Sequence, residues 1–386
     1  MVLADLQKNS LIINCSTCGS ELEIKLTTSI KEQTIRCGNC NSNYSFKNGY
    51  LNLLPPVIRK EICKKGMLTR KIKDHFHIEN LTKNEHDLIK GIIASKNMAK
   101  QYFKNVVHPM EASWSARAYE RYEDLMITNY LDSLLDDKKV TFVDAGSGPG
   151  RYLILLGSKM IQDSCKDLKK NPETAKLYQF DKKYANNLQY VVGIDYSEEM
   201  ISYSTKLLKK YGLGQLLNKK IFPVVGVAQN FHFNPRLLVD THKVVVCTFQ
   251  TLGNQENVDL QVEMLKSMKN LATPHGTLII SVFNKKLFKD FGLQKFYGRE
   301  VRRTVGEIIN TKDDIENAVL RTSKGVYSKW FSKKDLDSLL LKSGISKFKI
   351  MDESNIEPIS GFEEYLDIDE QKNQVFPRAI IAIAEI

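Results

Sequence analysis

The carboxyl-terminal two thirds of the chain alternates apolar runs with amphipathic segments. Five apolar runs predict strands, which fall within the ranges 140–145, 189–197, 221–231, 242–250 and 276–283. The segments between them have the spacing of helices. Because continuous apolar strands that alternate with helices form parallel sheets covered on both faces, we expect an α/β fold with helices on both sides of one sheet.

The first 110 residues follow a different pattern. Residues 22–26 alternate apolar and polar side chains as a strand of a small ribbon does, and an Asn-Gly turn at 48–49 before prolines at 55–56 indicates a hairpin and then a boundary. Residues 57–105 carry twelve Lys or Arg against five Asp or Glu, with apolar residues at helical intervals. We therefore expect three parts: a ribbon (1–56), a basic helical connector (57–110) and an α/β domain (111–386).

Composition limits the class of protein. Of 386 residues, 42% are hydrophobic and 26% are charged, which are values of a folded globular chain and exclude wholesale disorder. No stretch approaches the roughly 18 apolar residues of a membrane span, and the first ten residues lack the regions of a signal peptide. We therefore expect a soluble cytoplasmic protein with no membrane partner. The formal net charge of +11 suits a polyanionic partner and equally a lysine-rich background.

Four of the seven cysteines are spaced for a metal ion. Cys15 and Cys18 form one C-x2-C pair, Cys37 and Cys40 form a second, and 18 residues separate the pairs, which is within the window for a zinc site of four thiolates. Four thiolates leave no open coordination position, so the predicted Zn2+ is structural, with iron as the alternative. A unit of this size has little core, and the metal would supply much of its folding free energy.

The first strand of the α/β domain leads into the most informative loop. The strand ends at Asp144, and three alternate glycines, Gly146, Gly148 and Gly150, precede a helix. Glycines let a ligand approach main-chain N–H groups where a helix begins. The spacing G-x-G-x-G differs from the G-x-G-x-x-G of dinucleotide folds, and the carboxylate before it suits a ligand with an ammonium group. The second strand ends at Asp195, the kind of residue that accepts hydrogen bonds from ribose hydroxyls.

This order of motifs resembles the class I S-adenosylmethionine-dependent methyltransferases over roughly residues 111–386. The resemblance implies a Rossmann-like sheet of seven strands, closed by a pair of opposed direction that 347–351 and 378–386 match. It also implies S-adenosylmethionine as the cofactor. Where the family has an acidic residue followed by alanine after strand three, this chain has Val227 and Ala228. The residues expected to bind the cofactor are Asp144, Gly146, Gly148, Gly150, Asp195, Tyr196, Ala228, Gln229 and Phe249.

Transfer of a sulfonium methyl group needs a nucleophile held in line with that group and water kept out, so positioning can suffice. If the acceptor loses a proton, a general base assists. The sequence leaves this base open among His232, Asn254, Tyr119 and Tyr122. For the histidine and the tyrosines, a hydrogen-bonded structural role and packing against the sheet are the alternatives.

Two classes of acceptor fit this chemistry. An N or O atom of a small metabolite is favoured, because residues 284–329 form an insertion like the substrate lids of small-molecule members and carry Arg299, Arg302 and Arg303. The alternative is an rRNA or tRNA base, because a ribbon ahead of such a domain also resembles the zinc-ribbon rRNA guanine methyltransferases. Ribbon and connector would then grip RNA phosphates. A third hypothesis is a non-catalytic scaffold that binds the cofactor. The oligomeric state is open.

Overall fold

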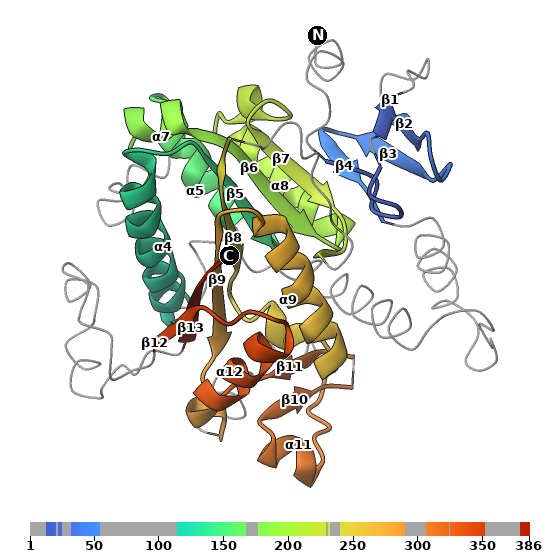
Figure 1. Ribbon diagram of the computed structural model, residues 1–386, viewed down its shortest axis with the longest axis vertical. Coiled ribbons are helices and arrows are strands. Elements are labelled where there is room, and N and C mark those ends of the chain that lie inside the picture. The colour runs from blue at the N-terminus through green and yellow to red at the C-terminus, as the bar shows by residue number, and fades with distance from the viewer. Residues whose placement is uncertain are drawn as a thin grey trace.

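The computed structural model describes residues 13–20, 22–24, 32–54, 114–166, 177–228, 231, 240–289, 306–323, 325–351 and 379–386. Within them, one sheet has the strand order β1-β2-β3-β4-β7-β6-β5-β8-β9-β13-β12 (Figure 1). Its last seven positions belong to the predicted α/β domain: β5 (Val140–Ala145), β6 (Leu188–Asp195), β7 (Ile221–Val225), β8 (His242–Cys247), β9 (Gly276–Phe283), β12 (Phe348–Met351) and β13 (Ala379–Glu385).

The directions of these strands match the predicted fold. β7, β6, β5, β8 and β9 run parallel to one another, whereas β13 runs antiparallel to both β9 and β12. The structure therefore confirms the predicted Rossmann-like α/β fold with a final pair of opposed direction. Because the five parallel strands share one direction, their carboxyl ends lie at the same edge of the sheet, which we call the carboxyl edge.

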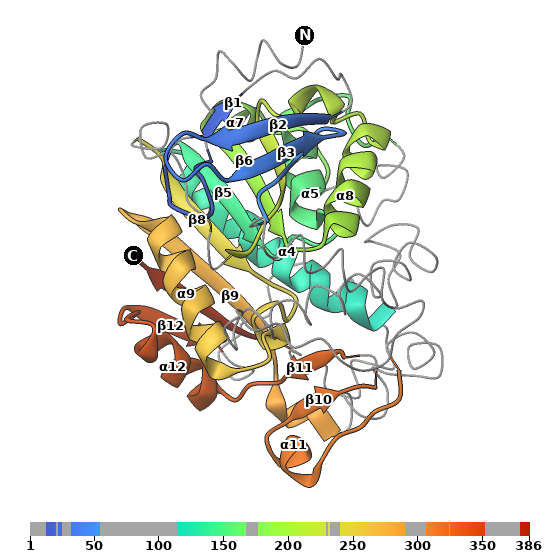
Figure 2. The same ribbon diagram turned by 90° about the vertical axis from the view of Figure 1, so that its right-hand side faces the viewer.

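Helices cover both faces of the sheet (Figure 2). Phe142 and its alternate neighbours pack beneath one group of helices, and Val143 and its neighbours pack beneath the other, with both side chains fully buried. This burial of both faces explains the continuous apolar runs in the sequence. The first group comprises α4 (Trp114–Leu135), α5 (Arg151–Met160), α7 (Lys182–Asn187) and α8 (Glu198–Lys210), and the second comprises α9 (Val258–Ala272) and α12 (Lys333–Lys342).

Side-chain caps fix where several of these helices begin. The Ser197 hydroxyl accepts a hydrogen bond from the Met200 N–H at the start of α8, and the Asn257 side chain accepts one from the Leu260 N–H at the start of α9. Such caps satisfy N–H groups that have no partner inside the helix. Both caps directly follow loops at the carboxyl edge, so they also fix the ends of those loops.

The ribbon strands extend the same sheet beyond β7. β1 (Leu22–Ile24), β2 (Glu32–Cys37), β3 (Asn43–Lys47) and β4 (Tyr50–Asn52) form an antiparallel meander. β4 then pairs in parallel with β7. Ile13, Ile35 and Tyr44 belong to the same buried cluster as apolar residues of the parallel strands. The boundaries of the three predicted parts stay a prediction, and the connector 57–110 lies outside the described residues.

The insertion after β9 is described in part, since Arg299, Arg302 and Arg303 lie outside the described residues. Its described part contains the short helix α11 (Lys312–Glu316) and a hairpin of β10 (Val319–Arg321) and β11 (Tyr327–Lys329). A bridge between Asn284 and Phe331 holds this unit at the carboxyl end of β9. Among the described helices, none has the length and apolar character needed to cross a lipid bilayer.

Candidate functional site

Four loops meet at the carboxyl edge of the sheet. The loop after β5 is fastened to the end of β6, because the N–H groups of Gly146 and Ser147 both donate to the Ile194 carbonyl, at 2.7 and 2.9 Å. The Gly148 N–H donates to the Asp195 carboxylate at 2.9 Å. The structure thus brings together the two predicted motifs, which are 45 residues apart in the sequence.

The three predicted glycines differ in what surrounds them. Gly146 (φ +93°) and Gly150 (φ +84°) have left-handed backbones, and an added Cβ would lie 2.2 Å from the Thr251 side chain at the first and 2.1 Å from the Ser204 hydroxyl at the second. These two positions are closed by packing. At Gly148 an added Cβ would meet no atom of the described residues within 4 Å. The loop therefore presents its middle glycine to open space, as a backbone cradle for a ligand does.

Asp144 lies beneath this loop in a protected position. Its side chain is 2% exposed, and its Oδ1 atom has no hydrogen-bond partner among the residues that the structure describes. Burial raises the pKa of Asp144, the Arg151 charge opposes this rise, and the nearby Asp195, Glu123 and Asp124 add to it, with a net value of about 8. A buried polar atom without a partner is uncommon in a folded protein and suits a site that a ligand completes.

Asp195 is held by main-chain donors. Its carboxylate accepts hydrogen bonds from the Ser197 N–H at 2.8 Å and the Gly148 N–H at 2.9 Å. Burial raises the pKa of Asp195 to about 6, and these two N–H groups act in the opposite direction. The carboxyl groups of Asp144, Glu123 and Asp124 therefore lie near one guanidinium, that of Arg151, and Asp195 adds a fourth acidic group beside Asp144. Such an excess of acidic groups favours a cationic ligand.

An ion-pair cluster, which the sequence did not reveal, links α4 to this edge. The Glu123 carboxylate is fully buried, accepts a hydrogen bond from the Phe249 N–H at 3.0 Å and forms an ion pair with Arg151. Arg151 is the first residue of α5, and its Nε atom lies 3.5 Å from the Asp124 carboxylate. Two adjacent carboxylates directly before an apolar run of a helix are the one signal that could have indicated this cluster.

The loop after β8 has a strained backbone. Phe249 (φ +48°) and Gln250 (φ +68°) are left-handed although neither is glycine. The Gln250 side chain is buried, accepts a hydrogen bond from the Phe283 N–H at 2.6 Å, and donates to the Ser328 hydroxyl and the Lys329 carbonyl. Non-glycine residues persist in this conformation only where their surroundings impose it, and such positions gather at functional sites. Here the amide of Gln250 fastens the loop to β9 and to the insertion.

The remaining predicted site residues are placed as follows. Ala228 follows β7, is buried, and its carbonyl accepts a hydrogen bond from the Ser267 hydroxyl at 2.7 Å. Tyr196 directly follows Asp195 and is partly buried. Asn254 ends the short helix η6 (Leu252–Asn254), is partly buried, and donates its N–H to the Gln250 carbonyl at 3.1 Å.

Three catalytic candidates and one cofactor candidate are not placed in this way. Tyr119 and Tyr122 belong to α4, but their side chains lie outside the described part of the structure, as do residues His232 and Gln229 altogether. Among the catalytic candidates, the structure therefore describes the side chain of Asn254 alone, and the choice of a general base stays a prediction.

The four predicted metal ligands come together in the ribbon. The Sγ atoms of Cys15, Cys18, Cys37 and Cys40 lie within 4.8 Å of one another. The Cys15–Cys40 and Cys18–Cys37 sulfur pairs are each 3.5 Å apart. Four sulfurs bound tetrahedrally at about 2.3 Å from a zinc ion are roughly 3.8 Å apart, so the cluster fits that ion closely.

Local hydrogen bonds prepare these sulfurs as ligands. The Thr17 N–H points at the Cys15 sulfur at 3.4 Å, and the Cys40 N–H points at the Cys37 sulfur at 3.5 Å. Hydrogen bonds from Ser20 lower the pKa of Cys18 to about 6, whereas burial raises the pKa of Cys37 to about 12. Four thiolate ligands would fill every position of a tetrahedral zinc ion, as they do in structural zinc sites.

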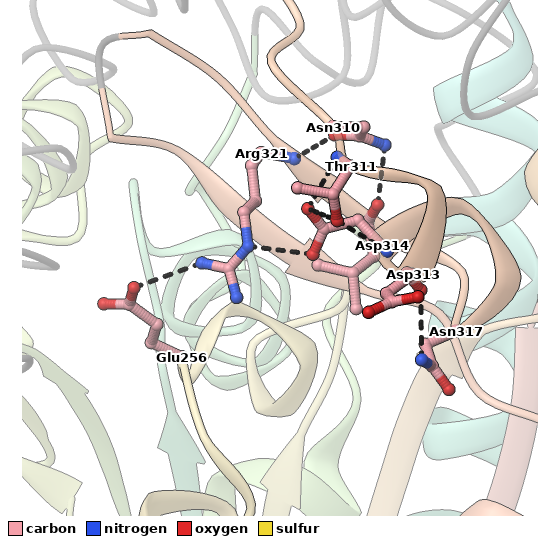
Figure 3. A network of polar contacts seen from close by, with 8 residues as sticks. Glu256, Asn310, Thr311, Asp313, Asp314, Asn317 and Arg321 are labelled. Atoms are coloured by element: carbon pink, nitrogen blue, oxygen red, sulfur yellow. Dashed lines mark hydrogen bonds and ion pairs between the residues drawn. The ribbon is translucent and has the colours of Figure 1, made fainter.

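A polar network joins the insertion to the loop after β8 (Figure 3). Arg321 of β10 is the centre of this network, with its guanidinium 3.2 Å from the Glu256 carboxylate and 3.0 Å from the Asp314 carboxylate. The Tyr327 ring lies 4.8 Å from the same guanidinium. Because two carboxylates already compensate its charge, Arg321 holds the insertion in place rather than offering a free cation to an anionic acceptor.

Comparisons with known proteins add little beyond the fold. No family model and no curated protein matches the chain. Among solved structures, the chain is similar to the plantazolicin methyltransferase BpumL in complex with SAH, with 16% identity, a TM-score of 0.43, and coverage of 85% of this chain and 98% of that one. It is also similar to the Burkholderia thailandensis 1,6-didemethyltoxoflavin-N1-methyltransferase, with 12% identity, a TM-score of 0.41, and coverage of 79% and 91%.

A third solved structure is a SAM-dependent methyltransferase from Methanosarcina mazei, with 17% identity, a TM-score of 0.38, and coverage of 67% of this chain and 96% of that one. Values this low carry neither an activity nor a ligand over to the present chain. The sheet order and the geometry of the carboxyl edge are properties of the chain itself.

Proposed function

We propose that this chain is an S-adenosylmethionine-dependent methyltransferase. The observation that carries the proposal is the carboxyl edge of β5 and β6, where the open cradle at Gly148 lies beside two carboxylates, Asp144 and Asp195. The cofactor supplies a methyl group already activated by a positively charged sulfur. A ligand with two cationic groups and a ribose meets complementary chemistry here, because the site has acidic groups in excess and a carboxylate beside main-chain donors.

Different residues of the chain would bind different parts of the cofactor. Asp195 would accept hydrogen bonds from the ribose hydroxyls, and Asp144 would face the methionine part. The Ala228 N–H would meet the adenine, and Phe249 would form the wall beside the sulfur. With these groups fixed in advance, the protein chiefly holds the acceptor in line and keeps water out.

We infer that the four cysteines hold a structural zinc ion. The close approach of the sulfurs and the N–H groups directed at them support this assignment. Four thiolates leave no position for a substrate, so the ion has no part in methyl transfer.

We propose an N or O atom of a small metabolite as the acceptor. Support comes from the insertion after β9, which Arg321 and Gln250 fasten beside the loop after β8. That position is next to Phe249 and Asn254, on the side of the cradle where the methyl group would be presented. An RNA base remains the alternative to be separated by experiment.

Calorimetry with S-adenosylhomocysteine tests the cofactor assignment. We expect one binding site in the wild type, and affinity at least about tenfold weaker in Asp195→Asn, which replaces the charge that the ribose would meet. Asp163→Asn is the matched control, since the Asp163 side chain is 84% exposed and belongs to none of the loops that form the proposed site. Absence of heat with wild-type protein would exclude the proposal.

A labelled-methyl assay then separates the acceptor classes. The zinc-loaded protein is incubated with labelled cofactor and, in parallel, with total RNA or with a metabolite extract. Label in the metabolite fraction supports the proposed acceptor, and label in RNA replaces it with the alternative. Cofactor binding without transfer to either fraction supports the scaffold hypothesis.

A further inference from the structure

The ribbon reaches the proposed cofactor site through its last strand. β4 runs parallel to β7, so its carboxyl end lies at the same edge as the cradle. The Leu53 N–H donates to the Val225 carbonyl at 2.7 Å, directly before the turn that leads to Ala228. The next residue of that turn, Gly226, donates its N–H to the Asp195 carbonyl at 2.9 Å. A short path of main-chain bonds therefore runs from the ribbon to Asp195.

A second contact runs from β4 to the start of α8. The Tyr50 hydroxyl donates to one carboxylate oxygen of Glu198 at 2.9 Å, and the Asn52 amide donates to the other at 3.4 Å. Tyr50 and Asn52 are 2% and 4% exposed, and Glu198 is partly buried, so the two donors are held in the protein interior. Glu198 is the first residue of α8, immediately after Ser197, whose N–H binds the Asp195 carboxylate.

Asn52 is itself fixed by its neighbours. Its side-chain oxygen accepts a hydrogen bond from the Leu54 N–H at 3.1 Å, so both ends of the amide are used. Burial and the Glu198 charge raise the pKa of Tyr50, which keeps its hydroxyl protonated as a donor. Both contacts to Glu198 therefore come from side chains whose orientation is set by the ribbon.

The four cysteines Cys15, Cys18, Cys37 and Cys40, which we call the knuckle, lie at the other end of this path. Ser16 lies inside the first cysteine pair, and its hydroxyl donates to the Leu53 carbonyl at 2.6 Å. The Tyr44 hydroxyl lies 3.1 Å from the Cys15 sulfur and 2.8 Å from the Thr17 hydroxyl. Leu53 is thus bonded on one side to the knuckle and on the other to β7. A metal ion that fixes the knuckle also fixes Leu53.

We propose that the four-cysteine knuckle and β4 position the cofactor site, with Tyr50, Asn52 and Leu53 as positioning residues, so that metal loading and cofactor affinity are coupled. This inference rests on the proposed function, because the ligand is the methyl-donor cofactor. The coupling is reciprocal: if zinc raises the affinity for the cofactor by some factor, the cofactor raises the affinity for zinc by the same factor.

The first test compares two tyrosine variants of the zinc-loaded full chain. Tyr50→Phe removes the hydroxyl that binds Glu198 and keeps the ring. Tyr130→Phe is the matched control, because it removes a hydroxyl bonded at 2.7 Å to Thr277, at the opposite edge of the sheet. We expect Tyr50→Phe to weaken S-adenosylhomocysteine binding about fivefold by calorimetry, with unchanged zinc content, and Tyr130→Phe to leave it unchanged.

A double-mutant cycle separates positioning from general destabilisation. If Tyr50 acts through Glu198, then Tyr50→Phe combined with Glu198→Ala weakens binding no more than the stronger single variant does. Simple addition of the two effects would overturn the assignment of Tyr50 as a positioning residue.

The second test reads the reciprocal effect. Zinc release to a chelator is followed with and without saturating S-adenosylhomocysteine, and hydrogen exchange is measured after zinc removal. We expect the ligand to shift the chelator midpoint upward. We also expect zinc removal to accelerate exchange in residues 222–228 and 195–201 but not in residues 276–283. If wild-type protein binds the ligand and zinc status changes neither affinity nor exchange, the inference fails and the proposed function stands. If wild-type protein does not bind the ligand, both fail.

Discussion

Replacement of Asp144 by asparagine should have opposite effects on stability and on binding. Asp144 is buried with one oxygen unpartnered, and burial raises its pKa from 3.8 to about 8. A carboxyl group whose pKa is higher in the folded than in the unfolded state binds a proton more tightly in the folded state. The free energy of unfolding therefore falls as the pH rises from 3.8 to 8. Asparagine has nearly the same shape as aspartic acid but does not ionise, so it removes this dependence on pH.

The size of the effect follows from the pH range. Each pH unit between the two pKa values costs at most about 1.4 kcal/mol, because the unfolded state ionises this carboxyl while the folded state keeps it protonated. This difference lowers the free energy of unfolding by up to about 4 kcal/mol at pH 7 and about 2 kcal/mol at pH 5. Relaxation of the surroundings reduces these limits. We expect Asp144→Asn to be more stable than the wild type by about 1 to 4 kcal/mol at pH 7, with a smaller gain at pH 5.

Binding should change in the other direction. The ionised form of Asp144 attracts the cationic ligand, so we expect wild-type affinity for S-adenosylmethionine to increase between pH 6 and pH 8. Asp144→Asn should bind at least about tenfold more weakly at pH 8, and the part of the pH dependence due to Asp144 should disappear.

Urea unfolding at pH 5 and pH 7, together with calorimetry at pH 6 and pH 8, measures both effects. Asp163→Asn, with a side chain that is 84% exposed, serves as the control for loss of a negative charge. A variant that is less stable than the wild type at pH 7, or a wild-type affinity independent of pH, would refute the assignment of Asp144 as a buried group that the ligand stabilises.

Three further substitutions test the packing around the site. Gly146→Ala places a Cβ 2.2 Å from the Thr251 side chain at a residue with a left-handed backbone. We therefore expect the free energy of unfolding in urea to fall by about 2 kcal/mol and cofactor binding to weaken. A variant as stable as the wild type would contradict this close packing. Gln250→Ala leaves the buried Phe283 N–H without its acceptor, so the free energy of unfolding should fall by about 2 kcal/mol or more. A fall of less than about 0.5 kcal/mol would argue that Gln250 does not fasten the loop after β8 to β9. Arg321→Ala removes two ion pairs of a side chain that is 38% exposed, so we expect a loss of less than about 1 kcal/mol that shrinks at high salt, and a salt-independent loss would be inconsistent with an ionic role.

Local patterns in the sequence were sufficient for much of the fold. Each parallel strand is marked by its own apolar run, and parallel strands end at one edge, so the meeting of Asp144 and Asp195 follows from two local signals. The knuckle is also local, because each C-x2-C pair makes its own turn.

Contacts between distant segments were not predictable in the same way. The pairing of β4 with β7 uses main-chain groups, which carry no mark in the side-chain pattern of either strand. The Glu123–Arg151 ion pair joins a helix to the start of another, and acidic residues on a helix most often face solvent. Both contacts depend on how elements far apart in the sequence are assembled.

The pairing of β4 with β7 joins the ribbon to the core of the parallel sheet. An isolated ribbon would bury little apolar area, whereas here Ile35 and Tyr44 share one core with Val192 and Val224. The knuckle is therefore braced by the parallel sheet, and β7 has no open edge where it pairs with β4. A partner gripped by the ribbon would act on Leu53 and, through it, on the turn that faces the cofactor. Under the proposed function, recognition by the ribbon and binding of the cofactor would thus be mechanically joined for either class of acceptor.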